Sequence, residues 1–332
     1  MNDVKVKIDL KKPVGYVGIG IPLILECVAE DAEAKAYTKC TSLDDVKTAG
    51  YEATTDMYKT AELIFMQDNP PKEIAICTTN TTVVEWLTTT GNLTKEWRHL
   101  ICINAKEETA AIIAEIEKTT DKMFFAGVAV DDTTKYTTEN INRTVMFYCT
   151  STKYAYPEAA FVGATAGLTA GSFTYKNIIL KGIEPQELSD SEIENIHKKG
   201  GITFVTKAGD NVTSEGKTLG GEYIDIIDSK DYIIQQITYR TQKLLNKSRK
   251  IAYDNNGIAM LESVTVDVLQ SAYNNGIIAN TADGAPDYSV NYILRENTKE
   301  TDRAKRNYVG GSFTFALAGA IHFVEITGEI TL

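Results

Sequence analysis

The sequence predicts an α/β domain followed by an α+β region, with an alternating strand at each end of the chain. Continuous apolar strands separated by helices predict a largely parallel sheet that is covered on both faces. Beyond Tyr156 this rhythm gives way to loops and two long helices. Both ends alternate polar and apolar residues, which is the period-2 pattern of a strand with one buried face. These three observations define the expected fold class.

The expected α/β domain begins with two helices and continues as strands and one further helix. Ser42 is a suitable N-cap for a short helix that ends at Gly50, and a second helix is expected over 54–66. An Asn-Pro-Pro break follows that helix. Strands are then expected at 72–79, 97–104, 123–130 and 144–150, with a helix at 107–118.

The second half of the chain has a different pattern. The small residues of GATAGLTAG permit close backbone packing, and a helix is expected in ELSDSEIENIHKKGG with Ser189 or Asp190 as its N-cap. Strands are expected at 202–206 and 223–227, on either side of a polar loop. Long helices are expected at 231–250 and 257–276, because their apolar residues recur at helical spacing.

Composition excludes several classes of protein. The 332 residues carry a formal net charge of -11, whereas nucleic-acid binding needs clustered Lys and Arg. The densest apolar run, MFFAGVAV, is far shorter than the roughly 20 residues of a membrane span. The N-terminus lacks the apolar core of a signal peptide. Five cysteines without CxxC spacing are expected to be free thiols in a reducing cytoplasm.

Motifs that suggest chemistry fail when their spacing is tested. GDNVTSEGKT resembles a phosphate-binding loop, but Asn211 stands where the first glycine is required, so a hairpin turn is expected. GYVGIG lacks the third glycine of a dinucleotide fingerprint. His99, His197 and His322 have no metal-ligand spacing, and Cys149 has no neighbouring base. We therefore expect no catalytic, cofactor-binding or metal-binding residue.

One charge pattern stands out in this acidic chain. Arg240, Lys243, Lys247 and Lys250 are three, four and three residues apart, which places them along one face of a helix. Two interpretations remain open: a solvated helix side, or a docking surface for an acidic partner.

Both termini read as strand-forming arms. Lys5 and Lys7 dominate the polar face at one end, and Glu325 and Glu329 do so at the other, so opposite charges favour their pairing. The two ends could pair within one chain. Glycine-rich hinges behind them favour projection onto a neighbour's sheet instead. The apolar arm residues are Val4, Val6, Ile8, Leu10, Val324, Ile326, Ile330 and Leu332, and the hinge glycines are Gly15, Gly18, Gly20, Gly310 and Gly311.

Several long phrases of the chain match a family pattern. They are SFTYKNIILKGIEPQEL, SEGKTLGGEYIDIIDSKDYI, KIAYDNNGIAMLESVTVDVLQSAYNNGII and GGSFTFALAGAIHFVEITGEI, with a weaker match in TSLDDVKTAGYEATTDMYKTAELIFMQDNPPKEIAI. On these residues the chain resembles the sheath proteins of contractile phage tails and of R-type bacteriocins, which are tail-like particles. The resemblance spans most of the chain and is strongest after residue 170.

The resemblance implies a structural part of a contractile machine, without enzymatic activity or cofactor. It implies an N-terminal arm (1–20), an outer α/β domain (21–215), an inner tube-facing α+β domain (216–309) and a C-terminal arm (310–332). The implied partners are further copies in hexameric rings, an inner tail tube protein, and baseplate and tail terminator proteins. Assembly in the bacterial cytoplasm into a virion or tail-like particle is implied as well.

On this resemblance the basic stripe from Arg240 to Lys250 becomes a candidate contact with the tube. Two other classes remain as alternatives. A cytosolic α/β dinucleotide-binding enzyme is disfavoured because the glycine fingerprint and a catalytic set are missing. A monomeric ligand-binding module leaves the two amphipathic ends unexplained.

Overall fold

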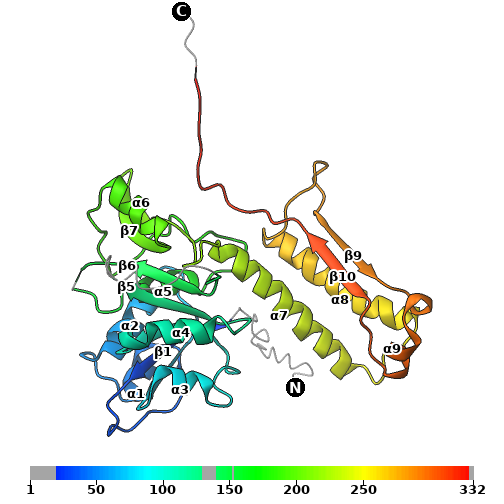
Figure 1. The fold of residues 1–332 in the computed structure, drawn as a ribbon, viewed down its shortest axis with the longest axis horizontal. Coiled ribbons are helices and arrows are strands. Elements are labelled where there is room, and N and C mark those ends of the chain that lie inside the picture. Colours follow the sequence, from blue (N-terminus) through cyan, green and yellow to red (C-terminus); the bar gives the residue numbers. More distant parts are fainter. Residues whose placement is uncertain (1–19, 129–139, 152, 329–332) are drawn as a thin grey trace, which may run out of the picture.

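A computed structural model of the protein describes residues 20–128, 140–151 and 153–328. Within them, one α/β body is joined by a long helix to a smaller helical and hairpin unit (Figure 1). The expected arm residues Val4, Lys5, Val6, Lys7, Ile8 and Leu10, the glycines Gly15 and Gly18, and Glu329, Ile330 and Leu332 lie outside the described residues.

The body is built on an eight-stranded sheet, counted over the described part of the chain, in the order β2-β3-β1-β4-β5-β6-β7-β8. All neighbours from β3 to β7 run parallel, whereas β2 and β8 pair antiparallel at the two edges. The strands are β1 (Ile21–Cys27), β2 (Thr38–Cys40), β3 (Ile74–Thr79), β4 (Trp97–Ile103), β5 (Met123–Val128), β6 (Thr144–Tyr148), β7 (Gly201–Lys207) and β8 (Asp210–Thr213). The prediction of a largely parallel α/β sheet is confirmed.

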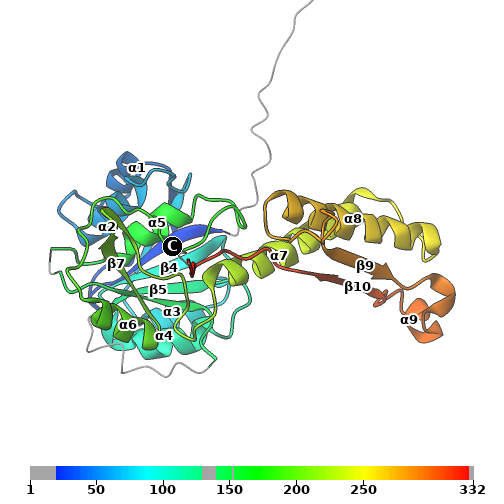
Figure 2. The same cartoon turned by 90° about the horizontal axis from the view of Figure 1, so that it is seen from above.

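Helices cover both faces of this sheet, as Figure 2 shows from above. Buried side chains of α1, α2 and α5 share one apolar core with the start of α7, and those of α3 and α4 share the core on the other face. The helices are α1 (Leu43–Thr48), α2 (Asp56–Phe65), α3 (Val83–Thr88), α4 (Thr109–Ile116), preceded by a 3-10 turn η1 (Lys106–Glu108), α5 (Glu158–Thr165) and α6 (Asp190–Lys198).

Local signals explain where several of these helices begin. The Ser42 hydroxyl accepts from the backbone N–H of Asp45, and Ser189 forms a capping box with Glu192 at the start of α6. The small residues of α5 allow close packing, because a Cβ at Gly163 would stand only 2.6 Å from the Cα of Ile64 in α2. The predicted close-packing segment is therefore confirmed at this position.

The C-terminal unit consists of two long helices, a two-stranded sheet and short helices. Its core is formed by side chains such as Ile233, Val268 and Leu269. The elements are α7 (Ile224–Lys247), α8 (Asn255–Asn274), β9 (Tyr288–Tyr292), the 3-10 turn η3 (Arg295–Asn297), α9 (Glu300–Ala304) and β10 (Gly311–Phe315). Strand β10 pairs antiparallel with β9.

One predicted element is wrong. Residues 223–227 were expected to form a strand, but α7 begins at Ile224. Alternating residues in EYIDII imitate a strand, whereas in the fold Ile224, Ile227 and Asp228 lie on one buried side of the helix. The expected hairpin is present, but its second strand is β8, and its turn contains Ala208 and Gly209, both with positive φ.

Candidate functional site

The first turns of α7 are fixed to the body by a buried cluster of opposite charges. Arg98 of β4 donates from Nη1 to Asp231 at 2.6 Å and from Nη2 to Asp228. Arg143, just before β6, donates from both terminal nitrogens to the two oxygens of Asp231, each at 2.9 Å. The Tyr175 hydroxyl donates to Asp228. Two cations of the body therefore pair with two anions in the first turns of α7. We call these side chains, Arg98, Arg143, Asp228 and Asp231, the Arg98 joint.

Burial makes this joint costly to break. The side chains of Arg98 and Asp231 are 0% and 2% exposed. Burial alone would lower the pKa of the Arg98 guanidinium, but Asp228 and Asp231 raise it, so this side chain stays charged. Backbone carbonyls complete the shell, since Arg98 also donates to the Asp121 oxygen at 2.8 Å and Arg143 to the Thr120 oxygen at 2.6 Å. These ion pairs and hydrogen bonds therefore fix the N-terminal turns of helix α7 to the α/β body.

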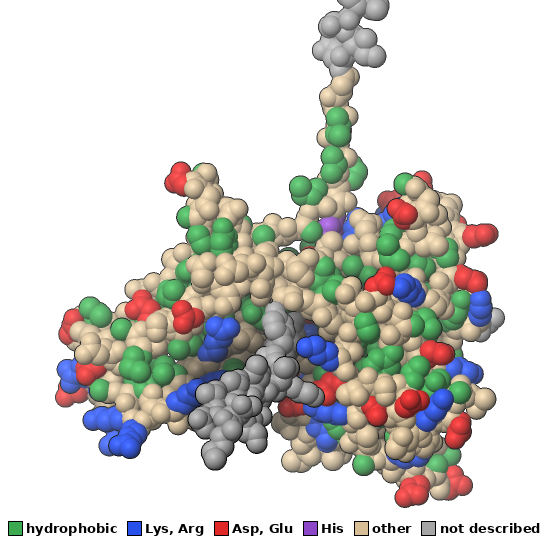
Figure 3. All heavy atoms as spheres, turned by 180° about the vertical axis from the view of Figure 1, so that it is seen from behind, with side chains coloured by type: hydrophobic (Ala, Val, Ile, Leu, Met, Phe, Trp, Pro, Cys, Tyr) green, Lys and Arg blue, Asp and Glu red, His purple; other side chains and the backbone are tan. Residues whose placement is uncertain are grey.

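The far half of α7 leaves the body. All buried residues of this helix lie before Ile237, and Tyr239 and Leu245 are exposed apolar side chains beyond that point. Of the predicted basic stripe, Lys243 and Lys247 are exposed on this half and Arg240 is half-buried, donating from Nε to Gln236. Lys250 is exposed but lies after the last helical residue. Figure 3 shows Lys and Arg side chains gathered along the lower edge of this part of the molecule.

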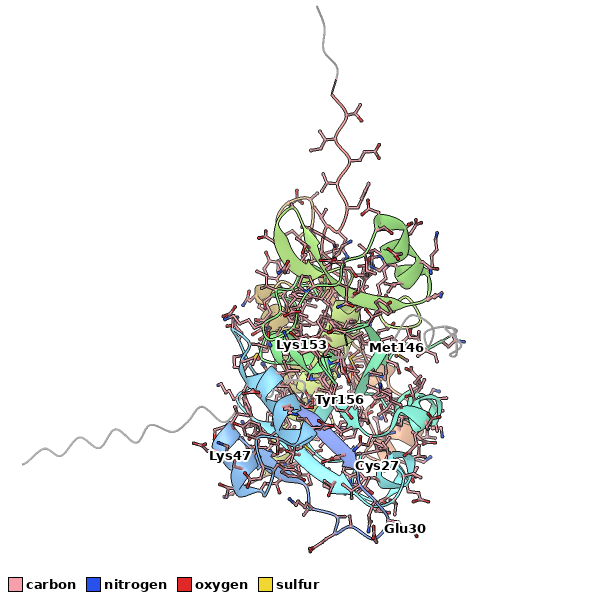
Figure 4. All side chains as sticks on the ribbon, turned by 90° about the vertical axis from the view of Figure 1, so that its left-hand side faces the viewer. Cys27, Glu30, Lys47, Met146, Lys153 and Tyr156 are labelled. Atoms are coloured by element: carbon pink, nitrogen blue, oxygen red, sulfur yellow. The ribbon has the colours of Figure 1, made fainter. Side chains whose placement is uncertain are left out.

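The chain leaves the small hairpin as an extended segment with exposed apolar side chains. Residues 318–328 form no helix or strand, and Ile321, Phe323, Val324 and Ile326 are 86%, 81%, 67% and 88% exposed. Glu325 is exposed between them. The segment rises clear of the other elements with side chains on alternate sides (Figure 4). No strand of the described residues pairs with this segment, so its strand character stays a prediction.

Two expected hinge sites have another role in the fold. Gly311 is the first residue of β10, where an added Cβ would stand 2.7 Å from the ring of Tyr292, and the Gly310 oxygen accepts from Ile293. An added Cβ at Gly20 would stand 2.8 Å from the Cβ of Arg98. Close packing favours glycine at both places, and the φ of +125° at Gly20 favours it as well, so their role as hinges stays a prediction. The chain departs from the hairpin further on, near Gly319, which has φ of +57° and open space around it.

The carboxyl end of the parallel sheet is where a dinucleotide would bind in an α/β enzyme. The loop after β1 reads VAEDAEAK, with Glu30, Asp31 and Glu33 in place of glycines. Carboxylates there repel phosphate, and the side chains hinder close approach of the backbone. Figure 4 labels Cys27, Glu30 and Tyr156 on this side of the body. The edge does not favour the enzyme alternative.

The other chemical candidates are embedded in packing. His99 is buried in β4 against Phe125, and burial holds its pKa well below the usual range. His197 contacts the hydroxyl of Ser214 at 2.8 Å. Cys149 is a free, half-buried thiol whose pKa is raised by burial. Over the residues that the structure describes, no three His, Cys, Asp or Glu side chains group as a metal site, and no helix has the length and apolar character of a membrane span.

The ion pairs of the Arg98 joint were not predicted from the sequence. Arg98 stands in the apolar strand WRHLICIN, and a charge inside such a strand was the available signal. Its partners are 130 and 133 residues away, so no local pattern connects them.

A comparison with models of known protein families matches the part of the chain that begins at α7. Residues 224–330, which start at the first residue of α7, match the family described as E217 tail sheath protein gp31-like, C-terminal domain. A comparison with curated protein sequences gives no match.

The whole chain is similar to solved sheath structures. It aligns with a chain of the cryo-EM structure of the anti-feeding prophage baseplate, with a TM-score of 0.73 at 11% identity over 100% of this chain and 99% of that chain. The anti-feeding prophage helical sheath in the contracted state gives 0.72 at 11% identity, over 99% and 98%. The sheath tail protein of Listeria innocua gives 0.53 at 10% identity, over 82% and 88%. The resemblance to contractile tail sheath proteins is thus confirmed: residues 224–330 match a tail sheath C-terminal domain, and the chain as a whole has the sheath fold.

Proposed function

We propose that this chain is the subunit of a contractile tail sheath, which stacks as rings of six around an inner tube and drives that tube through a cell envelope. The observation that carries the proposal is the exposed apolar segment 321–328, on a chain whose fold matches sheath proteins over its full length. Isolated soluble chains rarely expose such a run of apolar side chains unless a partner covers it.

Strand pairing between copies accounts for this segment. An extended segment adds to a sheet edge through main-chain hydrogen bonds, and each bond contributes about 0.5–1.5 kcal/mol. Burial of each Val, Ile or Phe side chain contributes a further ~1.5–3 kcal/mol. The β9–β10 hairpin, whose two strands pair only with each other among the described residues, offers edges for a neighbour's strand. Such links can persist while the bodies that they join change position.

The two parts of the chain then have different surroundings. The α/β domain, residues 21–215, is the outer part, and residues 216–309 form the inner part around the tube. The exposed half of α7 carries Lys243 and Lys247 together with Leu245, a mixture that suits an acidic tube surface with apolar patches. The tube protein, the baseplate and a tail terminator are the proposed partners, and assembly takes place in the bacterial cytoplasm.

No chemical reaction is required of this subunit. In the proposed cycle the extended lattice is metastable and the contracted lattice has the lower free energy, so contraction releases energy stored at assembly. A baseplate signal starts the transition. The acidic loop after β1 and the hairpin at Gly209 give no support to nucleotide hydrolysis as the source of energy.

Electron microscopy of the purified full chain tests the proposal. Rings or long tubes with six-fold symmetry are the expected result, and co-expression with the tube protein is expected to give sheathed tubes. Dispersed particles under all assembly conditions, with thermal stability that rises when a dinucleotide is added, would contradict it and support the enzyme alternative.

A further inference from the structure

After β10 the C-terminal segment runs back toward the α/β body. Its first part is tied to the loop after α8: the Ala316 oxygen accepts from Ala279 at 2.9 Å, and the Ala318 N–H donates to Ile277 at 2.9 Å. Figures 1 and 2 show the segment passing from the hairpin across α7 to the body before it projects. One further residue of the segment contacts the body, and the projecting part begins after it.

That contact is made by His322. Its Nε2 lies 2.8 Å from the Thr174 hydroxyl, and its Nδ1 lies 3.5 Å from a carboxylate oxygen of Glu215. The ring packs edge-on against Tyr223, with 5.0 Å between ring centroids and an interplanar angle of 79°. Lys176 donates to the backbone oxygen of His322 at 3.3 Å. Side-chain and main-chain atoms of this one residue are therefore both held.

The contrast with its neighbours in the sequence is large. The His322 side chain is 11% exposed, whereas Ile321 and Phe323 on either side are 86% and 81% exposed. The apolar side chains of Ile321 and Phe323 are thus exposed, while the polar side chain between them is largely covered. This arrangement is the reverse of the usual one, in which apolar side chains are buried and polar side chains are exposed. It indicates that His322 has a different role from its two neighbours.

The residues that receive His322 belong to the body and to the start of α7. Thr174 and Lys176 follow α5, Glu215 follows β8, and Tyr223 is the N-cap residue of α7. The carboxylate of Glu215 also lies 3.7 Å from the ammonium of Lys176, and the Thr174 hydroxyl contacts Asp225 as well. The receiving surface is thus built from the same region that holds α7 through the Arg98 joint.

We propose that His322 is a positioning residue, which anchors the root of the C-terminal segment to its own subunit and fixes the point and direction in which residues 323–328 leave. Its use in joining copies rests on the proposed function, but the anchoring does not. In an assembled sheath the anchor would make the segment move with the body and α7 of its own subunit.

A distance measurement between two spin labels tests the anchor. Labels are introduced with genetically encoded residues at Lys198 of α6 and Thr327, and the labelled full chain is diluted into unlabelled chain so that only distances within one copy are recorded. The wild type is expected to give one narrow distribution. H322A is expected to lose the narrow peak, because the segment then pivots from Ala318.

Two further variants keep the test falsifiable. Ile321→Ala changes an exposed neighbour and should leave the narrow peak intact. Thr174→Val removes the hydroxyl contact without changing the segment itself, so it should broaden the peak even if H322A folds poorly. A narrow peak that survives in both H322A and Thr174→Val, or equal broadening in Ile321→Ala, overturns the anchor. Tube formation is read separately by electron microscopy, so failure to form tubes leaves the distances interpretable.

Discussion

In its first half, from Ile224 to Gln236, helix α7 is largely buried and carries carboxylates that two arginines neutralise. In its second half, from Ile237 to Lys247, the same helix exposes lysines and apolar side chains. Continuous helical hydrogen bonding makes the two halves one rigid element. This difference in burial indicates that the first half of α7 stabilises the fold of the subunit, whereas the second half is available to bind a partner.

The largest effect on stability is expected in the first half. Asp231→Asn removes the anion that both Arg98 and Arg143 face, so Asp228 is the one carboxylate of the joint that still faces its two buried guanidinium groups. We expect the free energy of unfolding to fall by about 3–5 kcal/mol. Urea denaturation measures this loss.

The matched control is Glu194→Gln, which breaks an exposed ion pair with Lys198. The side chains of Glu194 and Lys198 are 66% and 69% exposed. It should change stability by less than about 1 kcal/mol. An equally small effect of Asp231→Asn would show that the cluster does not hold α7 to the body.

The body also contains a buried carboxylate, Glu158, that is not neutralised in the way Asp228 and Asp231 are, because one of its oxygens has no hydrogen-bond partner in the described structure. Glu158 of α5 is 2% exposed, and its Oε2 accepts no hydrogen bond in the described structure. Burial raises the pKa of Glu158 from 4.5 to about 7. The folded state therefore favours the protonated form, and this contribution to stability is complete below pH 4.5 and is lost as pH rises through 7.

Glu158→Gln is expected to stabilise the protein at pH 8 by on the order of 3 kcal/mol and to have little effect at pH 4. Urea denaturation at the two pH values measures the difference. Glu107→Gln, an identical change at an exposed position, serves as the control and should be neutral at both. A pH-independent effect of Glu158→Gln would contradict the assignment of an unfavourable buried carboxylate.

The smallest effect on stability is expected in the second half of α7. Lys243→Glu combined with Lys247→Glu changes exposed residues, so the free energy of unfolding should stay within about 0.5 kcal/mol of wild type. Assembly of extended sheath around the tube should nevertheless be abolished, which electron microscopy of the co-expressed proteins records. Normal extended particles would refute the tube contact and leave the stripe as a solvated helix side.

Most of the body could be predicted because its signals are local. The apolar runs at β3, β4, β5 and β6, and the caps at Ser42 and Ser189, act over a few residues. Strand β1 was missed, because Pro22 and the preceding glycines suggested a hinge. In the fold Pro22 stands near the start of β1, at a shift of register with β4, where proline is tolerated.

The candidate site was less accessible from sequence. No role was predicted for Asp228 and Asp231, because only the fold brings Arg98 and Arg143 to them. The exposed half of α7 was indicated by charge spacing alone. His322 was assigned to a terminal strand, and its contacts with Thr174 and Glu215 join residues 148 and 107 positions apart, which no periodicity reveals.

The most direct test concerns the C-terminal segment as the link between copies. A variant that lacks residues 323–332 keeps His322, the anchor and every described helix and strand. Negative-stain images and a urea denaturation curve are recorded for this variant and for the full chain. We predict tubes from the full chain only, with equal free energies of unfolding. Tubes of the same length and number from the shortened chain would contradict the account.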